Sequence, residues 1–402
     1  MKTKCRLCKS DKLVDILSLG KCYLSDFVVS GKKPPKYPLD LVFCTDCTLV
    51  QLKKTTPPEL LYTKRYGYKS GVSKTMCDEL KDIARSAQKF RKNSHNPVVV
   101  DIGANDGTLL SFFSDDCLKV GIDPVKKFRA ECSKHADIVI NDYFSWQVFN
   151  NGLGKKKADV VCAIACFYDV DNLNKFVSDV AKILKDDGVF VVQQNYLVEM
   201  LKNSAFDNIV HEHLTYFSLS ALEKIFAKHD LEIFNAKLRD INGGSLRTYV
   251  GYKGKKSISK KVGLLRERER RFRLHDKKTY DKFAKKVKAN SHKLAKFIKK
   301  VKSTGKKVYI YGASTRGNTL LQFYGLDKRF IEAAVERNPE KWGKKIASVG
   351  IPIISEEQAR KDNPDYMLVL PWHFRREIIK REKKYLANGG HFIFPLPEFE
   401  VI

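Results

Sequence analysis

The segment VVVDIGANDGTLLSFF (residues 98–113) decides the fold of this chain. It reads as an apolar strand, then a glycine turn, then a helix. Further strand-like apolar runs follow at residues 120–123, 138–142, 158–165 and 188–194, and helical patterns separate them. Alternating strands and helices predict a doubly wound α/β domain built on a parallel sheet.

The glycine turn predicts a cofactor site. Gly103 and Gly107 fall between the strand and the helix, where a ligand can approach the backbone closely. The turn lacks the Gly-x-Gly-x-x-Gly spacing of dinucleotide sites. S-adenosylmethionine (SAM) carries a sulfonium and an ammonium cation, which Asp101 and Asp106 can neutralise. Asp123, at the end of the next strand, is placed to bind the ribose hydroxyls.

The cofactor site extends beyond this turn. Tight packing is the competing explanation for the glycines, but strand, turn, helix and distal acid together favour a cofactor. We expect the strand end at residues 163–168 to wall the adenine. The residues expected to contact SAM are Ser70, Asp101, Gly103, Asn105, Asp106, Gly107, Leu109, Asp123, Pro124, Ala165, Tyr168 and Gln194.

Two Cys-x-x-Cys pairs lie near the N-terminus, Cys5 with Cys8 and Cys44 with Cys47. Each pair presents two thiolates from one tight turn, and together they can bind one tetrahedral Zn²⁺. Four protein ligands leave no position for water, so we interpret the metal as structural. A redox pair or packing cysteines are the alternatives, which the doubled spacing disfavours.

Length and composition set the domain organisation. The chain has 402 residues, 43% of them hydrophobic, which favours two or three domains. We expect a zinc-binding module at 1–62, a SAM-binding domain at 63–250, a helical connector at 251–300 and a smaller Rossmann-like α/β domain at 301–402. No membrane-spanning run or signal peptide is present in the sequence. We therefore expect a cytoplasmic monomer without a membrane partner.

The chain is strongly basic. Lys and Arg number 75 against 46 Asp and Glu, a formal net charge of +29, which raises nucleic acid as a partner. Much of the excess lies between Lys253 and Lys307, where apolar residues recur at helical spacing. Such lysines are typical of solvated helix faces, and no base-stacking residues accompany them. We therefore expect no nucleic-acid partner.

The C-terminal α/β domain carries a second candidate binding turn. Residues 312–318 (GASTRGN) join a strand to a helix, so their N–H groups and hydroxyls could hold a pyrophosphate. Residues 242–247 (NGGSLR) offer close backbone approach and an arginine. A purely structural turn is the alternative in both places. The residues expected to bind substrate are Asn242, Gly244, Arg247, Ser314, Thr315, Arg316, Asn318, Glu336, Arg337, Trp372 and His373.

The run FDNIVHEHLTYF (residues 206–217) places His211 and His213 on either side of Glu212. A neutral histidine can remove a proton, and an adjacent carboxylate can orient it. A histidine satisfied within the core is the competing interpretation. The spacing differs from the His-Glu-x-x-His helix of zinc peptidases, so we expect no metal here.

An ordered set of motifs resembles the sugar-nucleotide C-methyltransferase family over nearly the whole chain. The motifs are the two Cys-x-x-Cys pairs, YGYKSG (66–71), DIGANDGTLL (101–110), FDNIVHEHLTYFS (206–218), NGGSLRTYV (242–250), YGASTRGNTLLQ (311–322) and LVLPWHFRREI (368–378). The resemblance implies an N-terminal zinc domain, a central class I SAM methyltransferase domain, and a C-terminal Rossmann-like domain that helps to hold a nucleotide sugar.

The resemblance also implies a reaction used to build branched deoxysugars. A base removes a proton from the carbon next to a 4-keto group, and the enolate attacks the cofactor methyl. In this family's pattern His213 is the base, with Glu212 and His211 beside it. Tyr66 or Tyr68 is the expected donor to the developing oxyanion.

Two segments depart from the family pattern. Some members carry an Asn and a His after the fourth strand, where this chain has the segment Ala165 to Val170, including Asp169. A tyrosine that often precedes the His-Glu-His triplet is replaced by Val210. These departures bear on the substrate and on the carbon that is methylated.

Other functions compete with carbon methylation. Methylation of a sugar oxygen or nitrogen is the main alternative, because the same histidine can deprotonate a hydroxyl or an amine. RNA methylation or RNA binding is suggested by the charge of +29 and the zinc pairs. A non-catalytic scaffold is the third alternative.

Overall fold

The computed structural model describes residues 4–63, 66–90 and 95–402. The strands of its central sheet are β5 (Val98–Ile102), β6 (Leu118–Ile122), β7 (Ile138–Ile140), β8 (Ala158–Ile164), β9 (Leu184–Asn195), β11 (Leu231–Arg239) and β12 (Ser245–Tyr252). They are ordered β11-β12-β9-β8-β5-β6-β7. Strands β5 to β9 are parallel, β12 pairs antiparallel with β9, and β11 pairs antiparallel with β12 at the edge of the sheet. The predicted doubly wound α/β domain is confirmed.

Helices cover both faces of this sheet, because alternate residues of a strand point to opposite sides. The helices are α1 (Lys74–Gln88), α2 (Arg129–Cys132), α3 (Trp146–Leu153), α4 (Leu173–Ile183), α5 (Leu197–Lys202) and α6 (Leu219–Ala227). The face that carries Val189 and Val191 packs against α1. The opposite face packs against α6, where Phe190 meets Phe226 at a centroid distance of 6.0 Å.

The α-helix expected directly after the glycine turn does not form. Only one 3₁₀ turn, η3 (Leu110–Phe112), follows it. The chain then turns at Ser114, whose carbonyl accepts a hydrogen bond from Cys117 N–H (3.2 Å) and whose hydroxyl donates to Asp116. Such local bonds of Ser and Asp compete with helix formation, and β6 begins immediately afterwards.

The C-terminal domain has a second, mainly parallel sheet. Its strands are β13 (Val308–Tyr311), β14 (Ala334–Val335), β15 (Lys345–Ile346), β16 (Ile351–Ile354), β17 (Tyr366–Val369), β18 (His391–Phe394) and β19 (Glu400–Val401). Its helices are α9 (Thr315–Tyr324), α10 (Glu356–Asp362), α11 (Arg375–Arg381) and α12 (Lys383–Ala387). The predicted smaller Rossmann-like domain is therefore present.

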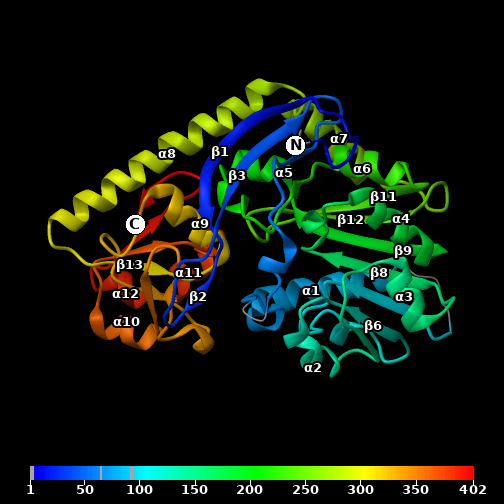
Figure 1. Ribbon diagram of the computed structural model, residues 1–402, viewed down its shortest axis with the longest axis horizontal. Coiled ribbons are helices and arrows are strands. Elements are labelled where there is room, and N and C mark those ends of the chain that lie inside the picture. The colour runs from blue at the N-terminus through cyan, green and yellow to red at the C-terminus, as the bar shows by residue number, and fades with distance from the viewer. Residues whose placement is uncertain (1–3, 64–65, 91–94) are drawn as a thin grey trace.

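Two helices connect these domains, α7 (Lys260–Phe272) and α8 (Lys277–Ser303). Helix α8 runs as one long rod across the top of the molecule (Figure 1). Its buried stripe includes Tyr280, Val287 and Leu294, while most of its lysines are exposed. The prediction that the lysine-rich region forms helices with solvated faces is thus confirmed for α8. Among the described residues, no helix combines the length and apolar character needed to cross a bilayer.

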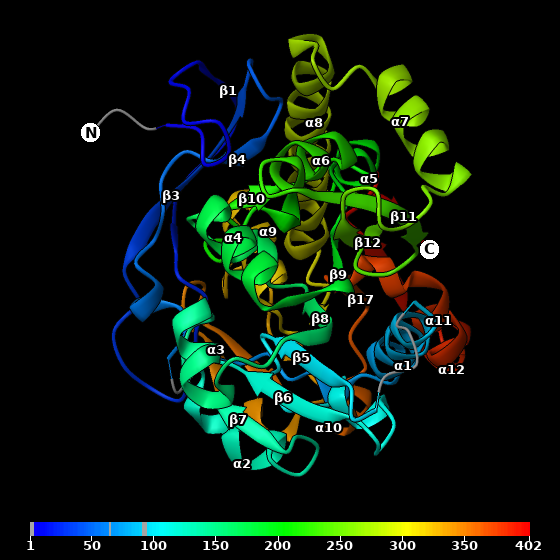
Figure 2. The same ribbon diagram turned by 90° about the vertical axis from the view of Figure 1, so that its right-hand side faces the viewer.

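The N-terminal module is a long antiparallel ribbon, which the sequence predicted only as a small turn-rich unit. It consists of β1 (Leu13–Tyr23), β2 (Phe27–Val28), β3 (Lys36–Cys44) and β4 (Val50–Leu52). At one end β4 pairs with β10 (Thr215–Tyr216) of the central domain, and at the other β2 pairs with β15 of the C-terminal domain. Figures 1 and 2 show this blue ribbon running from one domain to the other. The module therefore adds strands to both of its neighbours.

Candidate active site and zinc cluster

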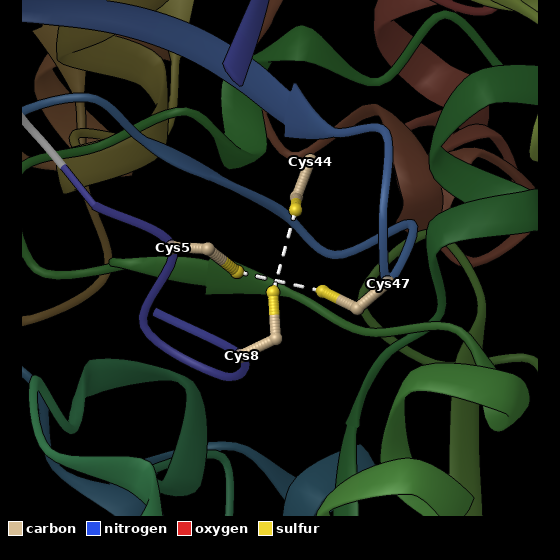
Figure 3. A group of neighbouring side chains, drawn as sticks. All are labelled: Cys5, Cys8, Cys44 and Cys47. Carbon is tan, nitrogen blue, oxygen red and sulfur yellow. Dashed lines mark hydrogen bonds between the residues drawn. The ribbon is translucent and has the colours of Figure 1, made fainter. Parts of the chain in front are cut away.

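The four predicted zinc ligands lie together at the central-domain end of the ribbon (Figure 3). All four sulfur atoms of Cys5, Cys8, Cys44 and Cys47 lie within 4.8 Å of one another. The Sγ atoms of Cys5 and Cys47 are 3.4 Å apart, and those of Cys8 and Cys44 are 3.5 Å apart. Sulfurs bound at ~2.3 Å around a tetrahedral Zn²⁺ are roughly 3.8 Å apart, so the cluster fits this ion.

Both cysteine pairs use the same turn geometry. Lys9 follows the first pair and Thr48 the second, and each residue has φ 65°. The N–H of Lys9 bonds the Cys5 carbonyl at 3.0 Å, and the N–H of Thr48 bonds the Cys44 carbonyl at 2.8 Å. Two equivalent turns therefore present two sulfurs each, as the spacing predicted.

Arg6, within the first cysteine pair, ties the cluster to the central domain. Its side chain is buried, and its Nε donates to Asp171 Oδ1 at 2.9 Å. Its Nη2 donates to the Thr55 hydroxyl at 2.8 Å, and that hydroxyl donates to the same Asp171 oxygen at 2.8 Å. Thr55 and Asp171 line the cavity described next. The zinc turn therefore supports one wall of that cavity.

A cavity of about 370 Å³ opens where β5, β6 and β8 end. Its lining contains eight of the residues expected to bind SAM: Ser70, Asp101, Gly103, Asn105, Leu109, Asp123, Pro124 and Ala165. It also contains four expected catalytic residues: Tyr66, Tyr68, His211 and Glu212. The glycine turn and the His-Glu-His segment thus line one space, although they lie far apart in the sequence.

Asp101 gives this cavity a site for a cation. The carboxyl is buried, and its pKa is held well above the usual range by burial and by repulsion from Asp123 and Asp106. Within the described part of the chain, no lysine or arginine lowers this pKa. A ligand that brings positive charge would supply the missing partner, which fits the ammonium and sulfonium groups of SAM.

Asp123 has the geometry of a ribose ligand. Its Oδ2 accepts a hydrogen bond from Asn105 N–H and its Oδ1 one from Val125 N–H, both at 2.8 Å. These bonds fix the carboxylate at the cavity wall, and each oxygen retains a second lone pair. The ribose hydroxyls of SAM are donors of the kind that these lone pairs accept.

The loop at residues 66–71 closes one side of the cavity and is held by the glycine turn. The Asn105 side chain accepts from Ser70 N–H at 3.1 Å and donates to the Tyr68 carbonyl at 3.2 Å. Asp106 Oδ2 accepts from Gly71 N–H at 2.8 Å. Asp106 therefore anchors the loop and, contrary to expectation, does not line the cofactor cavity.

Three other expected SAM contacts also lie outside the cavity lining. A Cβ on Gly107 would meet the Cys132 Cα at 3.0 Å, so this glycine serves helix packing. The Tyr168 ring is buried against His213, with centroids 4.3 Å apart. Gln194 is 2% exposed, and neither amide atom has a hydrogen-bond partner among the described residues. The sequence indicated that these residues lie near the cofactor site, but it could not show toward which side each side chain points.

The two histidines have different surroundings. His211 is buried, its Nε2 lies 3.2 Å from the Tyr37 carbonyl, and burial lowers its pKa to about 4. His213 lies just outside the cavity lining, with its Nδ1 2.9 Å from the Asn208 carbonyl. Burial, followed by the Arg316 charge, lowers the His213 pKa to about 3. A carbonyl can only accept, so Nδ1 carries the proton and Nε2 keeps its lone pair.

The cavity contains acidic and phenolic groups that the sequence analysis did not select as site residues. Asp169 and Tyr62 both line it. Burial and the neighbouring Glu212 raise the pKa of Asp169 well above its usual range, and a hydrogen bond from Tyr62 opposes this shift. Asp169 occupies one of the segments that depart from the family pattern, which was the available signal. Tyr62 had no signal beyond lying four residues before Tyr66.

Arg316 connects the C-terminal domain to the histidine segment. Its Nε and Nη2 donate to Asp207 Oδ2 at 2.9 and 2.6 Å, and its Nη1 donates to the Asn242 carbonyl at 3.0 Å. Trp372 Nε1 donates to the same Asp207 oxygen at 3.0 Å. Asp207 is 1% exposed. Arg316 and Trp372 therefore bind the buried carboxylate of Asp207. Both had been expected to contact the substrate.

Arg247, the arginine of the segment at residues 242–247, also pairs with carboxylates of the protein. Its side chain is fully buried, with Nη2 2.7 Å from Glu79 and Nη1 2.8 Å from Asp82. Its Nε donates to Gln193 at 2.7 Å. A buried guanidinium that is paired with two carboxylates of α1 cannot also reach a substrate. The expected contact between Arg247 and the substrate is therefore corrected.

The remaining expected substrate ligands mostly serve structural turns. Gly244 packs on Glu199, where a Cβ would come within 2.5 Å of the Glu199 Cβ. Ser314 caps α9 by accepting from Gly317 N–H at 3.0 Å. Glu336 accepts from the N–H of Ala313 at 3.1 Å. Of the others, Asn318 is buried against Ser348, Thr315 lies in the first turn of α9, Arg337 is exposed, and His373 has a buried Nδ1 without a partner among the described residues.

Comparison with known proteins identifies the family. Three domain models match the chain: a zinc binding domain at residues 5–62, a methyltransferase domain at 68–235 and a C-methyltransferase C-terminal domain at 240–397. The C-methyltransferase NovU of Streptomyces niveus is 30% identical over 410 aligned residues, which cover 99% of this chain and 96% of NovU. The chain belongs to the C-methyltransferase family. It is a SAM-dependent methyltransferase with a structural zinc site.

Solved structures of other methyltransferases overlap part of this C-methyltransferase. The plantazolicin methyltransferase BpumL in complex with SAH is 13% identical, with a TM-score of 0.35 over 43% of this chain and 82% of BpumL. A SAM-dependent methyltransferase from Clostridium acetobutylicum is 13% identical, with a TM-score of 0.34 over 44% of this chain and 92% of its own.

The zinc cluster generates the first prediction. Cys44→Ser removes one thiolate, and we expect the purified variant to lose its zinc and to unfold at a Tm lower by about 5 °C or more. Metal analysis by plasma mass spectrometry and thermal denaturation measure the two effects. Cys22→Ser is the matched control, because Cys22 lies in β1 outside the cluster and should keep one zinc per chain. A Cys44→Ser variant with full zinc content would contradict the assignment.

The buried carboxyl generates the second prediction. Asp101→Asn removes the negative charge that faces the cationic cofactor, and we expect SAM affinity to fall by about tenfold or more. Because the pKa of Asp101 is raised, the ligand-free variant should be at least as stable as the wild type at neutral pH. Calorimetry and thermal denaturation measure these effects, with the exposed Asp240→Asn as control. Unchanged SAM affinity would exclude Asp101 as the partner.

Proposed function

We propose that this C-methyltransferase methylates a carbon next to the 4-keto group of a nucleotide-linked deoxysugar. Carbon methylation requires that a carbon acid be deprotonated, so the site needs a positioned base and donors for the oxyanion. SAM supplies the electrophilic methyl group when it is bound. The observation that carries the proposal is the orientation of His213, whose Nδ1–H is held by the Asn208 carbonyl.

His213 is the base in this proposal. Because its pKa is lowered to about 3, the imidazole is neutral throughout the neutral pH range and its Nε2 lone pair is free to accept a proton. Its neighbour Glu212 lines the cavity, and the proposal places the reacting carbon of the sugar beside Glu212, within reach of His213 Nε2. The low pKa makes His213 a weak base, and the charge that develops on the sugar oxygen must be stabilised by other groups.

The phenols of the cavity are suited to that second role. Burial and the nearby Asp169 and Glu212 carboxyls raise the pKa of Tyr66 well above its usual range. Tyr62 is shifted in the same direction, by burial and by Asp169. Phenols in this state remain protonated and can donate a hydrogen bond to a developing oxyanion. We therefore assign Tyr66 as the first candidate donor, ahead of Tyr68, whose side chain is 46% exposed.

The C-terminal domain has a positioning role in this mechanism. Asp207 immediately precedes Asn208, and both belong to the turn η6 (Phe206–Asn208). Arg316 and Trp372 hold Asp207 from the C-terminal domain, while the Asn208 carbonyl holds His213. The contact between domains therefore fixes the peptide that orients the base.

Hydrogen exchange at the sugar carbon tests the mechanism. In D₂O with S-adenosylhomocysteine, thymidine-diphosphate-4-keto-6-deoxyglucose should exchange hydrogen next to the keto group, observed by NMR. His213→Gln should slow this exchange by about a hundredfold or more, whereas His292→Gln on the exposed face of α8 should not. Loss of exchange in Glu212→Gln with retention in His213→Gln would transfer the base role to Glu212. Methyl transfer without exchange in any variant would favour an oxygen or nitrogen acceptor.

The charge of Arg316 generates a pH prediction. Arg316 lowers the pKa of His213, so Arg316→Met should raise that pKa above about 3, and the lost Asp207 partner shifts it the same way. The ring of Tyr168 packs on His213, and the charge that lowers the pKa of His213 is that of Arg316. Titration of ¹⁵N-labelled histidine by NMR measures the change, with the exposed Arg329→Met as control. An unchanged His213 pKa in Arg316→Met would contradict the coupling.

A further inference from the structure

We call the 370 Å³ cavity at the ends of β5, β6 and β8 the methyl-transfer cavity. A second hollow adjoins it on the face of the zinc ribbon. It has a volume of about 550 Å³, and its lining includes Lys21, Lys36, Lys54, Tyr37, Thr55 and Thr56. We call it the lysine hollow. Thr55 and Thr56 line both this hollow and the methyl-transfer cavity. The two spaces therefore share a wall formed by one dipeptide.

The two spaces are lined by different ionisable groups. The methyl-transfer cavity is lined by acids, among them Asp101, Asp123 and Glu212. The lysine hollow is lined by three lysines and a single acid, Asp40, whose Oδ1 accepts a hydrogen bond from Ser18 at 2.6 Å. A ligand that lies across Thr55 and Thr56 would place a neutral or donor-rich end among the acids and an anionic end among the lysines.

The lysines of this hollow are available to a ligand. All three are exposed, and within the described residues no ion pair involves them. Lys36 is held near the Tyr23 ring, with its Nζ 4.4 Å from the ring centroid. Arg316 and Arg247, two residues first expected to bind substrate, are instead paired with buried carboxylates. Within the described residues, Lys21 and Lys36 of the ribbon and Lys54, which follows β4, are thus cations next to the cavity without an ion pair.

Tyr37 adds a flat surface to the hollow. It lies between Lys36 and Pro38, its side chain is half-buried, and its carbonyl is the partner of His211 at 3.2 Å. This contact links the hollow to the His-Glu-His segment. Lysines beside a partly exposed aromatic ring are a combination that binds a phosphate chain and stacks a base.

We propose that the lysine hollow binds the diphosphate and nucleoside of the substrate, with the sugar directed across Thr55 and Thr56 into the methyl-transfer cavity. Lys21, Lys36 and Lys54 contact the diphosphate, and Tyr37 stacks on the base. This inference rests on the proposed function, because it takes the acceptor to be a nucleotide sugar. It moves the phosphate site from the C-terminal turn to the zinc ribbon.

Calorimetry at low ionic strength on the SAH-bound full chain tests this site, with inorganic pyrophosphate, thymidine diphosphate and uridine diphosphate as probes. The triple variant Lys21→Gln, Lys36→Gln and Lys54→Gln should weaken binding of the preferred nucleoside diphosphate by about tenfold or more. It should leave SAH affinity unchanged. The matched control replaces Lys285, Lys288 and Lys296, exposed lysines of α8, by Gln and should bind as the wild type does.

Tyr37→Leu separates the two parts of the site. It should weaken nucleoside diphosphate binding by about tenfold and leave pyrophosphate binding unchanged, because pyrophosphate has no base to stack. If the triple variant binds the nucleoside diphosphate as tightly as the wild type does, the lysine site alone is overturned. The C-terminal turn would then again be the expected phosphate site. A wild-type chain that binds none of the three probes would overturn both this site and the nucleotide part of the proposed function.

Discussion

The four cysteines fix the end of a ribbon on which the rest of the molecule depends. A module of this size buries too little apolar surface to stabilise itself, so zinc binding contributes the missing free energy. One end of the ribbon supplies β4 to pair with β10, and the other supplies β2 to pair with β15. Gln322 of the C-terminal domain adds two hydrogen bonds to Tyr23, at 2.7 and 3.1 Å. The metal site thereby stabilises a ribbon that pairs with a strand of each of the other two domains.

The distribution of charge follows the needs of the ligands rather than of the fold. Arginines at the centre of the molecule are neutralised by carboxylates, as Arg247 is by Glu79 and Arg316 by Asp207. Asp101 and Asp169, which line the cavity, have no arginine partner among the described residues, and burial raises the pKa of both. Burying an unpaired acid costs stability, so its persistence indicates a ligand that brings the counter-charge. Asp101 matches SAM in this respect.

Local sequence predicted the elements of the fold and failed where the contact was distant. The strands after residue 98, the glycine turn and the cysteine cluster follow from periodicity and spacing, which are properties of short segments. The ribbon's pairing with β10 and β15 was missed, because two-residue strands such as β2 carry no pattern of their own. Arg247 and Arg316 were misassigned for the same reason: a lone arginine beside glycines looks identical whether its partner is a phosphate or a carboxylate from another element. Gln194 and Tyr168 were misplaced because strand position alone does not tell which face a side chain occupies.

In the mechanism that we propose, carbon methylation gives a reason for the contact between the C-terminal domain and the histidine segment. An oxygen acceptor is deprotonated with little reorganisation, whereas a carbon acid needs the base, the oxyanion donor and the methyl group held together at one time. The turn Phe206–Asn208 carries the carbonyl that orients His213, and it is fixed from the C-terminal domain through Asp207. In the mechanism that we propose, the oxyanion donors come from the loop that follows the zinc module, and SAM lies where β5 and β6 end. The proposed base and its first candidate oxyanion donor therefore both belong to the central domain. The C-terminal domain fixes the segment that carries the base through Asp207, and the ribbon fixes the same segment through the pairing of β4 with β10.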